Sequence, residues 1–294
     1  MFSVLIPTYN NLKYLKICLD SIKKNSKFKH QIIIHVNHGN DGTLEYLDKN
    51  SIEYTYTVNN IGMPKALNLA SKNAKFKYIL ISHDDFYYCP GWDIEFEKEI
   101  NFINHNKFYL SSTMVGAGQV SFNAGETHES FDEKKLIENL ENIKTFNFQG
   151  TTKCPGLVHV DIWKNLGGWS EEFSPTGGDD TDFAMKLWKN DVRIFKGLGK
   201  SLAYHFGSIT TRKKDKSLFT YLGSRGNKIF LKKWGLSINF FEKFYLKSGL
   251  DKNKKLIFNK YDGPLKNPNK NFIFYLELIK VKIMLLYLTL TNFK

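Results

Sequence analysis

The segment KYILISHDDFYYCPGW, residues 77–92, carries the clearest fold signal in this chain. Residues 78–81 form a short apolar run of the kind found in buried strands. The run ends at Ser82, and two acids, Asp84 and Asp85, follow. Adjacent carboxylates repel one another unless a partner neutralises them. A divalent cation is one such partner, because Mg²⁺ and Mn²⁺ bind carboxylate oxygens and share them with phosphates. The alternative is that one acid caps the following turn.

Predicted strands alternate with predicted helices on the N-terminal side of this segment. Residues 2–6, 31–36 and 53–58 are apolar or β-prone runs, and residues 8–22 place apolar side chains at helical spacing. We expect Pro7 to end the first strand. Such alternation indicates right-handed βαβ units and an α/β fold with a mostly parallel sheet.

Polar side chains follow the ends of four predicted strands. Tyr9, Asn37 and Asn60 come after the first three, and Asp84 and Asp85 follow the fourth. Ligands of parallel sheets bind at the carboxyl ends of the strands, so we expect these side chains to line one pocket. One acid would hold a cation, and its neighbour would accept hydrogen bonds from a ribose hydroxyl.

A second acidic cluster lies in GGDDTDFAMKLWKND, residues 177–191. Asp179, Asp180 and Asp182 open a predicted helix, where the helix dipole favours negative charge. Three acids within four residues exceed what a cap needs, so we expect them to act on a ligand. The glycine pair before them lets backbone and ligand approach closely.

Six motifs in this order resemble family 2 of the GT-A-fold glycosyltransferases: SVLIPTYNNLKYLKICLDSI, VNHGNDGT, NIGMPKALNLA, ISHDDFYYCPGW, GGWSEEF and GGDDTDFAMKL. The resemblance covers residues 2–210. It implies a GT-A fold, with a Rossmann-like, mostly parallel central sheet flanked by helices. It also implies an inverting hexosyltransferase that moves a sugar from a nucleotide diphosphate-sugar, UDP on family grounds, to a hydroxyl of a glycan or glycoconjugate acceptor.

The resemblance assigns roles to the strand-end residues. The nucleotide-binding residues that it implies are Pro7, Thr8, Tyr9, Asn37, Asp41, Asn60, Lys65 and Asp84. Asp84 would bind the ribose and Asp85 the metal, Mn²⁺ or Mg²⁺, although the two roles are exchangeable. Ser82 stands where the family's DxD-type motif usually has a leading acid. Asn37 and His38 stand where an acid near the base is frequent.

The resemblance also assigns the second cluster. Asp180 matches the general base, with Asp179 in place of the preceding Glu of the family's ED motif. Asp179 and Asp182 would bind acceptor hydroxyls. Trp169 would form a platform for an acceptor sugar, with core packing as the alternative. His205 matches a metal ligand, since a neutral imidazole can coordinate a cation.

The positive charge is concentrated at the C-terminal end. The 294-residue chain has a net charge of +13: residues 1–206 hold 23 Lys/Arg and 24 Asp/Glu, whereas residues 207–294 hold 19 and 5. We therefore divide the chain into a GT-A catalytic domain, 1–206, and a basic, aromatic helical region, 207–294. Arg212 and Lys213 either touch the diphosphate or begin the basic region.

The basic region has two interpretations. It meets an anionic partner, either a membrane surface or a glycan, or it reflects a generally lysine-rich composition. The second is favoured by the scarcity of arginine, which occurs only at 193, 212 and 225. Residues 267–293 are strongly apolar, but three charges at their centre argue against a membrane span. They would dock on the body, on a second copy in a homo-oligomer, or flat on lipid. An N-terminus without a signal peptide and three isolated cysteines predict a cytoplasmic protein. If the basic region meets a membrane, the protein would be peripheral at its inner face.

Two other classes compete with this interpretation. A nucleotidyltransferase would usually carry a Gly-rich, basic phosphate loop after the first strand, and PTYNN, residues 7–11, contains neither glycine nor a basic residue. A non-catalytic nucleic-acid-binding protein would use the basic region, but no nucleic-acid motif is found in the sequence. We expect no nucleic-acid partner.

Overall fold

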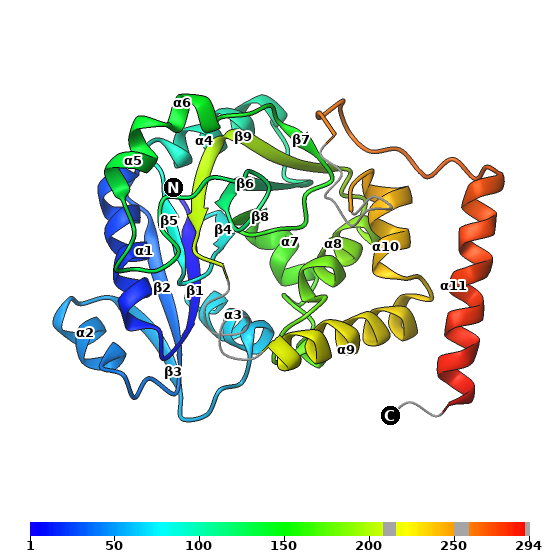
Figure 1. Ribbon diagram of the computed structural model, residues 1–294, viewed down its shortest axis with the longest axis horizontal. Coiled ribbons are helices and arrows are strands. Elements are labelled where there is room, and N and C mark those ends of the chain that lie inside the picture. Colours follow the sequence, from blue (N-terminus) through cyan, green and yellow to red (C-terminus); the bar gives the residue numbers. More distant parts are fainter. Residues whose placement is uncertain (208–215, 250–258, 292–294) are drawn as a thin grey trace.

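The computed structural model describes residues 1–207, 216–249 and 259–291 (Figure 1). The strands are β1 (Ser3–Tyr9), β2 (Gln31–Asn37), β3 (Glu53–Thr57), β4 (Tyr78–Ile81), β5 (Phe86–Tyr88), β6 (Phe108–Gly116), β7 (Phe148–Gln149), β8 (Gly156–His159) and β9 (Ile194–His205). The α-helices are α1 (Leu12–Asn25), α2 (Thr43–Lys49), α3 (Met63–Ser71), α4 (Trp92–Ile103), α5 (Glu133–Glu138), α6 (Leu140–Ile143), α7 (Val160–Asn165), α8 (Asp179–Lys189), α9 (Lys216–Trp234), α10 (Ile238–Phe241) and α11 (Phe272–Leu290). A 3₁₀ turn, η1 (Glu171–Phe173), and a π-helical turn, η2 (Glu242–Leu246), complete the described elements.

The described strands form one sheet in the order β3-β2-β1-β4-β8-β6-β9-β5, with β7 paired to β9. β3, β2, β1 and β4 are mutually parallel, as the alternation of strands and helices predicts. β6 and β9 are also parallel, whereas β8 is antiparallel to both of its neighbours. The predicted α/β, Rossmann-like architecture is therefore confirmed, with β8 separating two parallel blocks.

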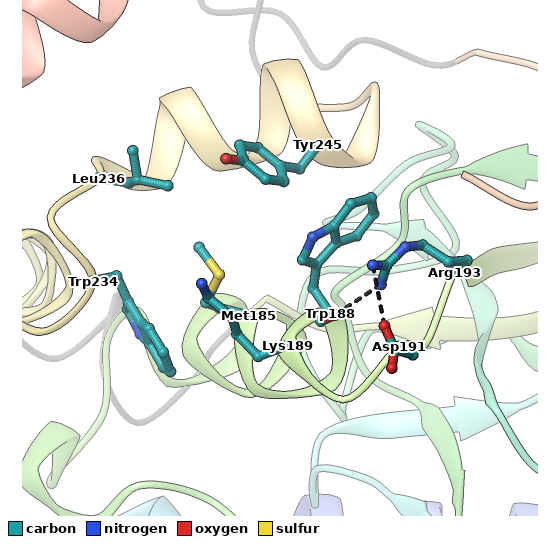
Figure 2. Close-up of a pocket in the computed structure, with 8 residues that line it drawn as sticks. All are labelled: Met185, Trp188, Lys189, Asp191, Arg193, Trp234, Leu236 and Tyr245. Carbon is teal, nitrogen blue, oxygen red and sulfur yellow. Dashed lines mark hydrogen bonds and ion pairs between the residues drawn. The ribbon is translucent and has the colours of Figure 1, made fainter. Parts of the chain in front are cut away.

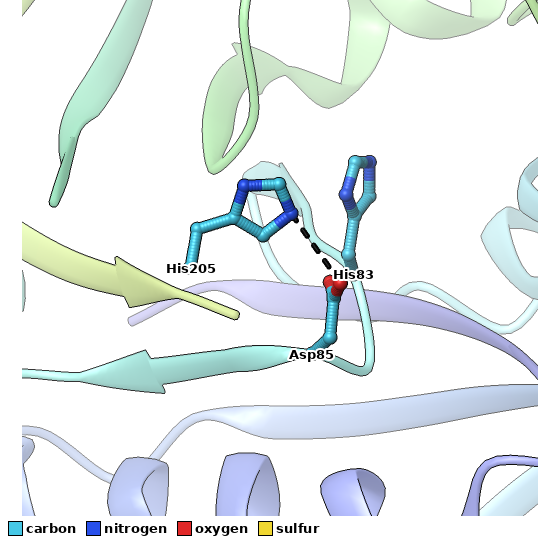
Figure 3. Close-up of side chains that lie close together, drawn as sticks. All are labelled: His83, Asp85 and His205. Carbon is cyan, nitrogen blue, oxygen red and sulfur yellow. Dashed lines mark ion pairs between the residues drawn. The ribbon is translucent and has the colours of Figure 1, made fainter. Parts of the chain in front are cut away.

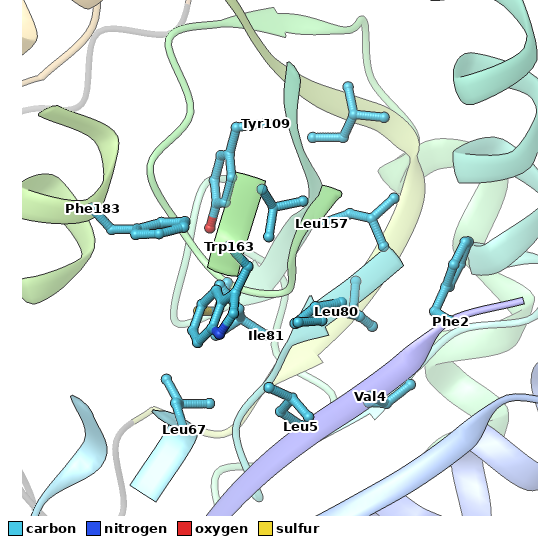
Figure 4. Close-up of a cluster of buried hydrophobic side chains, with 14 of the residues drawn as sticks. Phe2, Val4, Leu5, Leu67, Leu80, Ile81, Tyr109, Leu157, Trp163 and Phe183 are labelled. Atoms are coloured by element: carbon cyan, nitrogen blue, oxygen red, sulfur yellow. The ribbon is translucent and has the colours of Figure 1, made fainter. Parts of the chain in front are cut away.

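The central strands are continuous apolar runs because helices cover both faces of the sheet. Val4 and Leu5 of β1 and Leu80 of β4 are fully buried. Figure 4 shows them in one cluster with side chains from the surrounding helices, among them Leu67 of α3 and Trp163 of α7. This core fixes the strand ends, and with them the loops that carry the polar residues.

Pro7 does not end the first strand. β1 continues to Tyr9, and Pro7 pairs with His35 of β2 in the parallel register. The pairing of β1 with β4 stops at Leu5 and Ile81, and the Leu5 carbonyl accepts the Ser82 N–H at 3.0 Å. Residues two apart face the same neighbour, so the nitrogen of Pro7 faces the side where β4 has ended. A missing N–H costs nothing there.

The described C-terminal helices pack onto the body. Phe230 of α9, Phe241 of α10 and Leu246 of η2 belong to the main hydrophobic core. α11 is the outermost helix and stands against α9 and α10 at one edge of the molecule (Figure 1). Among the described helices, none has both the length and the apolar composition needed to cross a membrane.

Candidate active site

The acid pair after β4 lies at the carboxyl end of the parallel block. Thr8 of β1 donates a hydrogen bond to Asp84 at 2.7 Å, and both side chains are buried. Burial raises the pKa of Asp84 to about 7, and the charge of Asp85 acts in the same direction. The pair therefore accumulates negative charge that a cation would relieve, as the sequence predicts.

Asp85 lies between two histidines (Figure 3). The pairing of β5 with β9 sets Phe86 opposite His205, so His205 Nε2 lies 3.4 Å from an Asp85 carboxylate oxygen. His83 completes the group, and one potential ligand atom from each of the three residues lies within 4.8 Å of the others. His83 was not predicted from sequence, although its position beside the acid pair could have indicated it.

The orientation of the two imidazoles suits a cation. His205 Nδ1 lies 2.8 Å from the Ala117 carbonyl, which can only accept, so Nδ1 donates there and Nε2 faces Asp85. Burial lowers the pKa of His83 to about 4, so its ring is neutral near pH 7. Two imidazoles and a carboxylate form a donor set that fits a divalent metal such as Mn²⁺.

Asp180, at the start of α8, pairs with a lysine that was not predicted from sequence. Lys153 Nζ lies 2.5 Å from an Asp180 carboxylate oxygen. Burial alone would raise the pKa of Asp180, but the Lys153 ammonium holds it below its usual value. Glu242 of η2 belongs to the same group. The Thr181 hydroxyl can donate to the Glu242 carboxylate at 3.4 Å, and the Glu242 charge acts on Lys153 to raise the lysine's pKa. The Asp180 carboxylate is therefore ionised and able to accept a proton.

The other two acids of the second cluster have different surroundings. Asp179 accepts hydrogen bonds from the Thr176 hydroxyl at 3.0 Å and the Gly177 N–H at 3.1 Å. Burial raises its pKa to about 7, and the charge of Asp180 adds to the effect. Asp182 is fully buried and binds Trp234 Nε1 at 2.7 Å and Lys233 Nζ at 3.0 Å. Asp182 thus ties α9 to α8, which is a structural task.

The two acidic centres share one neighbourhood. The charges of Asp85, Asp180 and Lys153 all act on the ring of His83. The loop before α8 also touches the start of α3, where Met63 N–H donates to the Pro175 carbonyl at 2.8 Å. Gly62 has a φ of +81°, and a Cβ there would lie 2.4 Å from Pro175 Cα, so only glycine allows this approach.

Three of the predicted nucleotide-binding side chains support the backbone of the loops around the site. Asn37 is buried and accepts the Ile61 N–H at 2.9 Å. Asp41 accepts the N–H of Leu12 at the start of α1 at 2.8 Å. Asn60 accepts the Gly62 N–H at 2.9 Å.

Four predicted nucleotide contacts are exposed: Tyr9 at the end of β1, Lys65 in the first turn of α3, and Asp41 and Asn60 in the loops. Arg212 and Lys213 lie outside the described residues.

Trp169 does not offer a platform for a sugar. Its ring is 1% exposed and packs beside Phe183, so no face is open to an acceptor. Trp169 belongs to the main hydrophobic core, which is the alternative interpretation given for it from the sequence. It is therefore a packing residue and not an acceptor contact.

Two hollows lie near α8. The smaller, of about 50 Å³, includes Lys153 and Glu242 in its lining, beside Asp180. The larger, of about 240 Å³, lies at the other end of the helix and is shown in Figure 2. Arg193 stacks on Trp188 there, 4.0 Å from the ring centre. Neither acidic centre lines this second hollow, whereas Lys153 in the smaller one is the ion-pair partner of Asp180.

Comparisons with known proteins agree with this geometry. The model of glycosyl transferase family 2 matches residues 3–166, more than half of the chain. An uncharacterized glycosyltransferase of Rickettsia prowazekii is 40% identical over 200 residues, covering 64% of this chain and 59% of that protein. A second, from Rickettsia typhi, is 39% identical over 205 residues, covering 66% and 59%. The chain thus spans about three-fifths of the length of these relatives.

Solved structures show the same fold. Crystal structures of S. aureus TarS 1-349 superpose with a TM-score of 0.54 at 17% identity, covering 79% of this chain and 71% of that one. The complex of TarS 1-349 with UDP-GlcNAc gives a TM-score of 0.52 at 18% identity, covering 82% and 74%.

Proposed function

Because this chain belongs to glycosyl transferase family 2, we propose that it transfers a hexosyl group from a UDP-sugar to a hydroxyl of a glycan or glycoconjugate, with inversion at the anomeric carbon. The observation that carries the proposal is that the two acidic centres act on the same His83 ring; one is a group that could hold a cation and the other holds an ionised carboxylate. Family membership also argues against the two competing classes considered from the sequence, a nucleotidyltransferase and a non-catalytic nucleic-acid-binding protein.

The donor is proposed to bind across the carboxyl ends of β1 and β4. Asp84 is held in place by Thr8 and is the candidate partner of a ribose hydroxyl. Tyr9 and Lys65 are exposed at the same edge, where a base and a phosphate would meet them. TarS crystallises with UDP and UDP-GlcNAc, which supports a UDP-sugar as the donor for this fold.

His83, Asp85 and His205 would hold a divalent metal, Mn²⁺ or Mg²⁺. Such an ion would neutralise the charge that develops on the diphosphate as it leaves. The protein's own part is to orient the ligands: the Ala117 carbonyl fixes the tautomer of His205, and burial keeps His83 neutral. The first effect directs His205 Nε2 toward Asp85, and the second leaves a His83 lone pair available at neutral pH.

Asp180 is the proposed general base. The acceptor oxygen attacks the anomeric carbon from the face opposite the diphosphate, and its proton passes to the Asp180 carboxylate. The bond between the anomeric carbon and the diphosphate oxygen breaks, and UDP leaves with the electron pair. Lys153 keeps Asp180 ionised between turnovers, and Asp179 is proposed to bind another acceptor hydroxyl.

The first test is UDP release from a panel of UDP-sugars with Mn²⁺, paired with calorimetric titration of UDP. A positioned base contributes about 10²–10⁴-fold to the rate, so Asp180→Asn should lose activity by that factor and still bind UDP. Asp85→Asn should lose the Mn²⁺-dependent part of UDP binding.

Asp20→Asn, an exposed acid on α1, is the matched control and should retain both properties. Full activity of Asp180→Asn, or UDP binding that ignores both Mn²⁺ and Asp85, would overturn the proposal.

A further inference from the structure

α11 carries two separate apolar faces. The inner face consists of Phe274, Leu278, Val281, Leu285 and Leu288, which pack with α9, α10 and η2. Their spacing of four and three residues places them along one line of the helix. This line satisfies the need of α11 to dock on the body, so the other apolar side chains of the helix require a separate explanation.

The outer face is exposed. Its members are Phe272, Ile273, Tyr275, Leu276, Ile279, Ile283, Met284, Leu286, Tyr287 and Leu290, each between 43 and 76% exposed. Elsewhere in the described residues, exposed large apolar side chains occur singly, as at Phe102 and Val58. Scattered exposed residues are normal, but a contiguous patch of this kind marks an interaction surface.

The width of the outer face distinguishes between partners. Leu276, Ile279, Ile283 and Leu286 form its central line, and Tyr275 and Tyr287 extend it on opposite sides. A helix pair buries only a narrow seam and places charges beside it, whereas a helix lying in a lipid surface buries a broad apolar face. Tyrosines at the edges of the face suit the boundary between lipid and water.

The charge of the C-terminal region also distinguishes a second copy of the chain from a lipid surface as the partner. Residues 207–294 hold 19 Lys/Arg and 5 Asp/Glu. Two copies meeting through α11 would bring two strongly positive regions together, which is unfavourable, whereas an anionic surface attracts them. Lys280 and Lys282 are exposed on the two flanks of the outer face. Lys280 pairs with Glu277 at 3.0 Å, and Lys282 donates to the Gly235 carbonyl at 3.3 Å. At a membrane these surface contacts would exchange for headgroups, because lysine can extend its ammonium group from an apolar surface.

We propose that the outer face of α11 lies flat in the headgroup region of an anionic membrane and holds the enzyme there as a peripheral protein. The apolar side chains enter the boundary of the lipid tails, and the lysines of the C-terminal region contact the headgroups. The active site lies in the body, on other elements than α11, so this attachment does not depend on the proposed reaction.

The test is co-sedimentation of the full chain with vesicles of phosphatidylglycerol and phosphatidylcholine in equal parts. The chain should pellet with them, should be released by high salt, and should bind pure phosphatidylcholine at least about tenfold more weakly. The triple variant Ile279→Glu/Ile283→Glu/Leu286→Glu should lose binding by more than about tenfold, because membrane affinity scales with buried apolar area. These side chains are exposed, so folding should be preserved, and thermal unfolding checks it.

The matched control adds the same three charges to exposed apolar positions elsewhere, Tyr56→Glu/Phe102→Glu/Phe146→Glu, and should bind like the native chain. A second variant, Lys280→Gln/Lys282→Gln, keeps the apolar face and should bind anionic vesicles severalfold more weakly. Failure to pellet, equal binding to neutral vesicles, or undiminished binding by the α11 triple variant would each overturn the proposal. A dimer that the triple variant abolishes, without vesicle binding, would assign the face to a second copy.

Discussion

Replacement of Lys153 by methionine tests how the proposed base is kept ionised. Burial alone would raise the pKa of Asp180, but the Lys153 ammonium, 2.5 Å from its carboxylate, holds it low. Methionine keeps much of the apolar stem of lysine and removes the charge. Only the hydrogen bonds from Thr181 then oppose the effect of burial, so the pKa of Asp180 rises and the carboxyl is protonated up to a higher pH.

The size of the effect follows from the separation of the two charges. At 2.5 Å, Coulomb's law with water-like screening gives about 1.7 kcal/mol. We use this strong screening because the Lys153 side chain is 40% exposed and exposed ion pairs are worth little. A change of about 1–2 kcal/mol corresponds to a factor of about 5–30 in the ratio of protonated to ionised Asp180.

The assay is the rate of UDP release as a function of pH, with Mn²⁺ and the donor identified in the panel above at saturation. On the acidic limb of the profile, where Asp180 is mostly protonated, Lys153→Met should be about 5–30-fold slower than the native chain, and it should approach the native rate toward alkaline pH, because deprotonation restores the base. Lys153→Arg, which retains the charge, should keep the native profile. If the rate of Lys153→Met differed from the native rate by the same factor at every pH, the reasoning would be refuted.

Further predictions concern stability. Asp182→Ala should lower the free energy of unfolding by about 2–4 kcal/mol in chemical denaturation, because it leaves Lys233 and Trp234 without their buried partner; an unchanged midpoint would show that α9 does not depend on this contact. Gly62→Ala should cost about 1–3 kcal/mol, since the backbone is left-handed there and the new Cβ meets backbone before α8. A carboxyl whose pKa is raised in the folded state stabilises the protein at low pH and loses that contribution as pH rises. With the pKa of Asp84 at about 7, Asp84→Asn should raise the metal-free Tm more at about pH 8 than at about pH 5, and a uniform shift would contradict this.

The fold and the acid pair were predictable because both depend on local sequence. Continuous apolar runs mark strands buried on both faces, and parallel strands place the residues after them at one edge. Pro7 shows the limit of local rules, because whether proline ends a strand depends on which neighbouring strand has already stopped. That information lies in the register of β4, which the sequence of β1 does not contain.

The parts of the site that were missed come from long-range contacts. Lys153 lies 27 residues before Asp180 in an irregular segment, and Glu242 lies 61 residues after Thr181. Nothing in their local sequence separates them from other charged residues. Trp169 and Asp182 show the opposite error: their residue types suggest ligand contacts, but their positions bury them in the core and against α9.

The most direct test of the central claim is a crystal of the chain grown with Mn²⁺ and UDP, measured for anomalous scattering of manganese. We predict a single strong peak bounded by His83, Asp85 and His205, with the UDP diphosphate beside it and the Asp180 carboxylate facing the same pocket. A manganese peak away from these three residues, or UDP bound where Asp180 cannot reach its diphosphate end, would contradict the account.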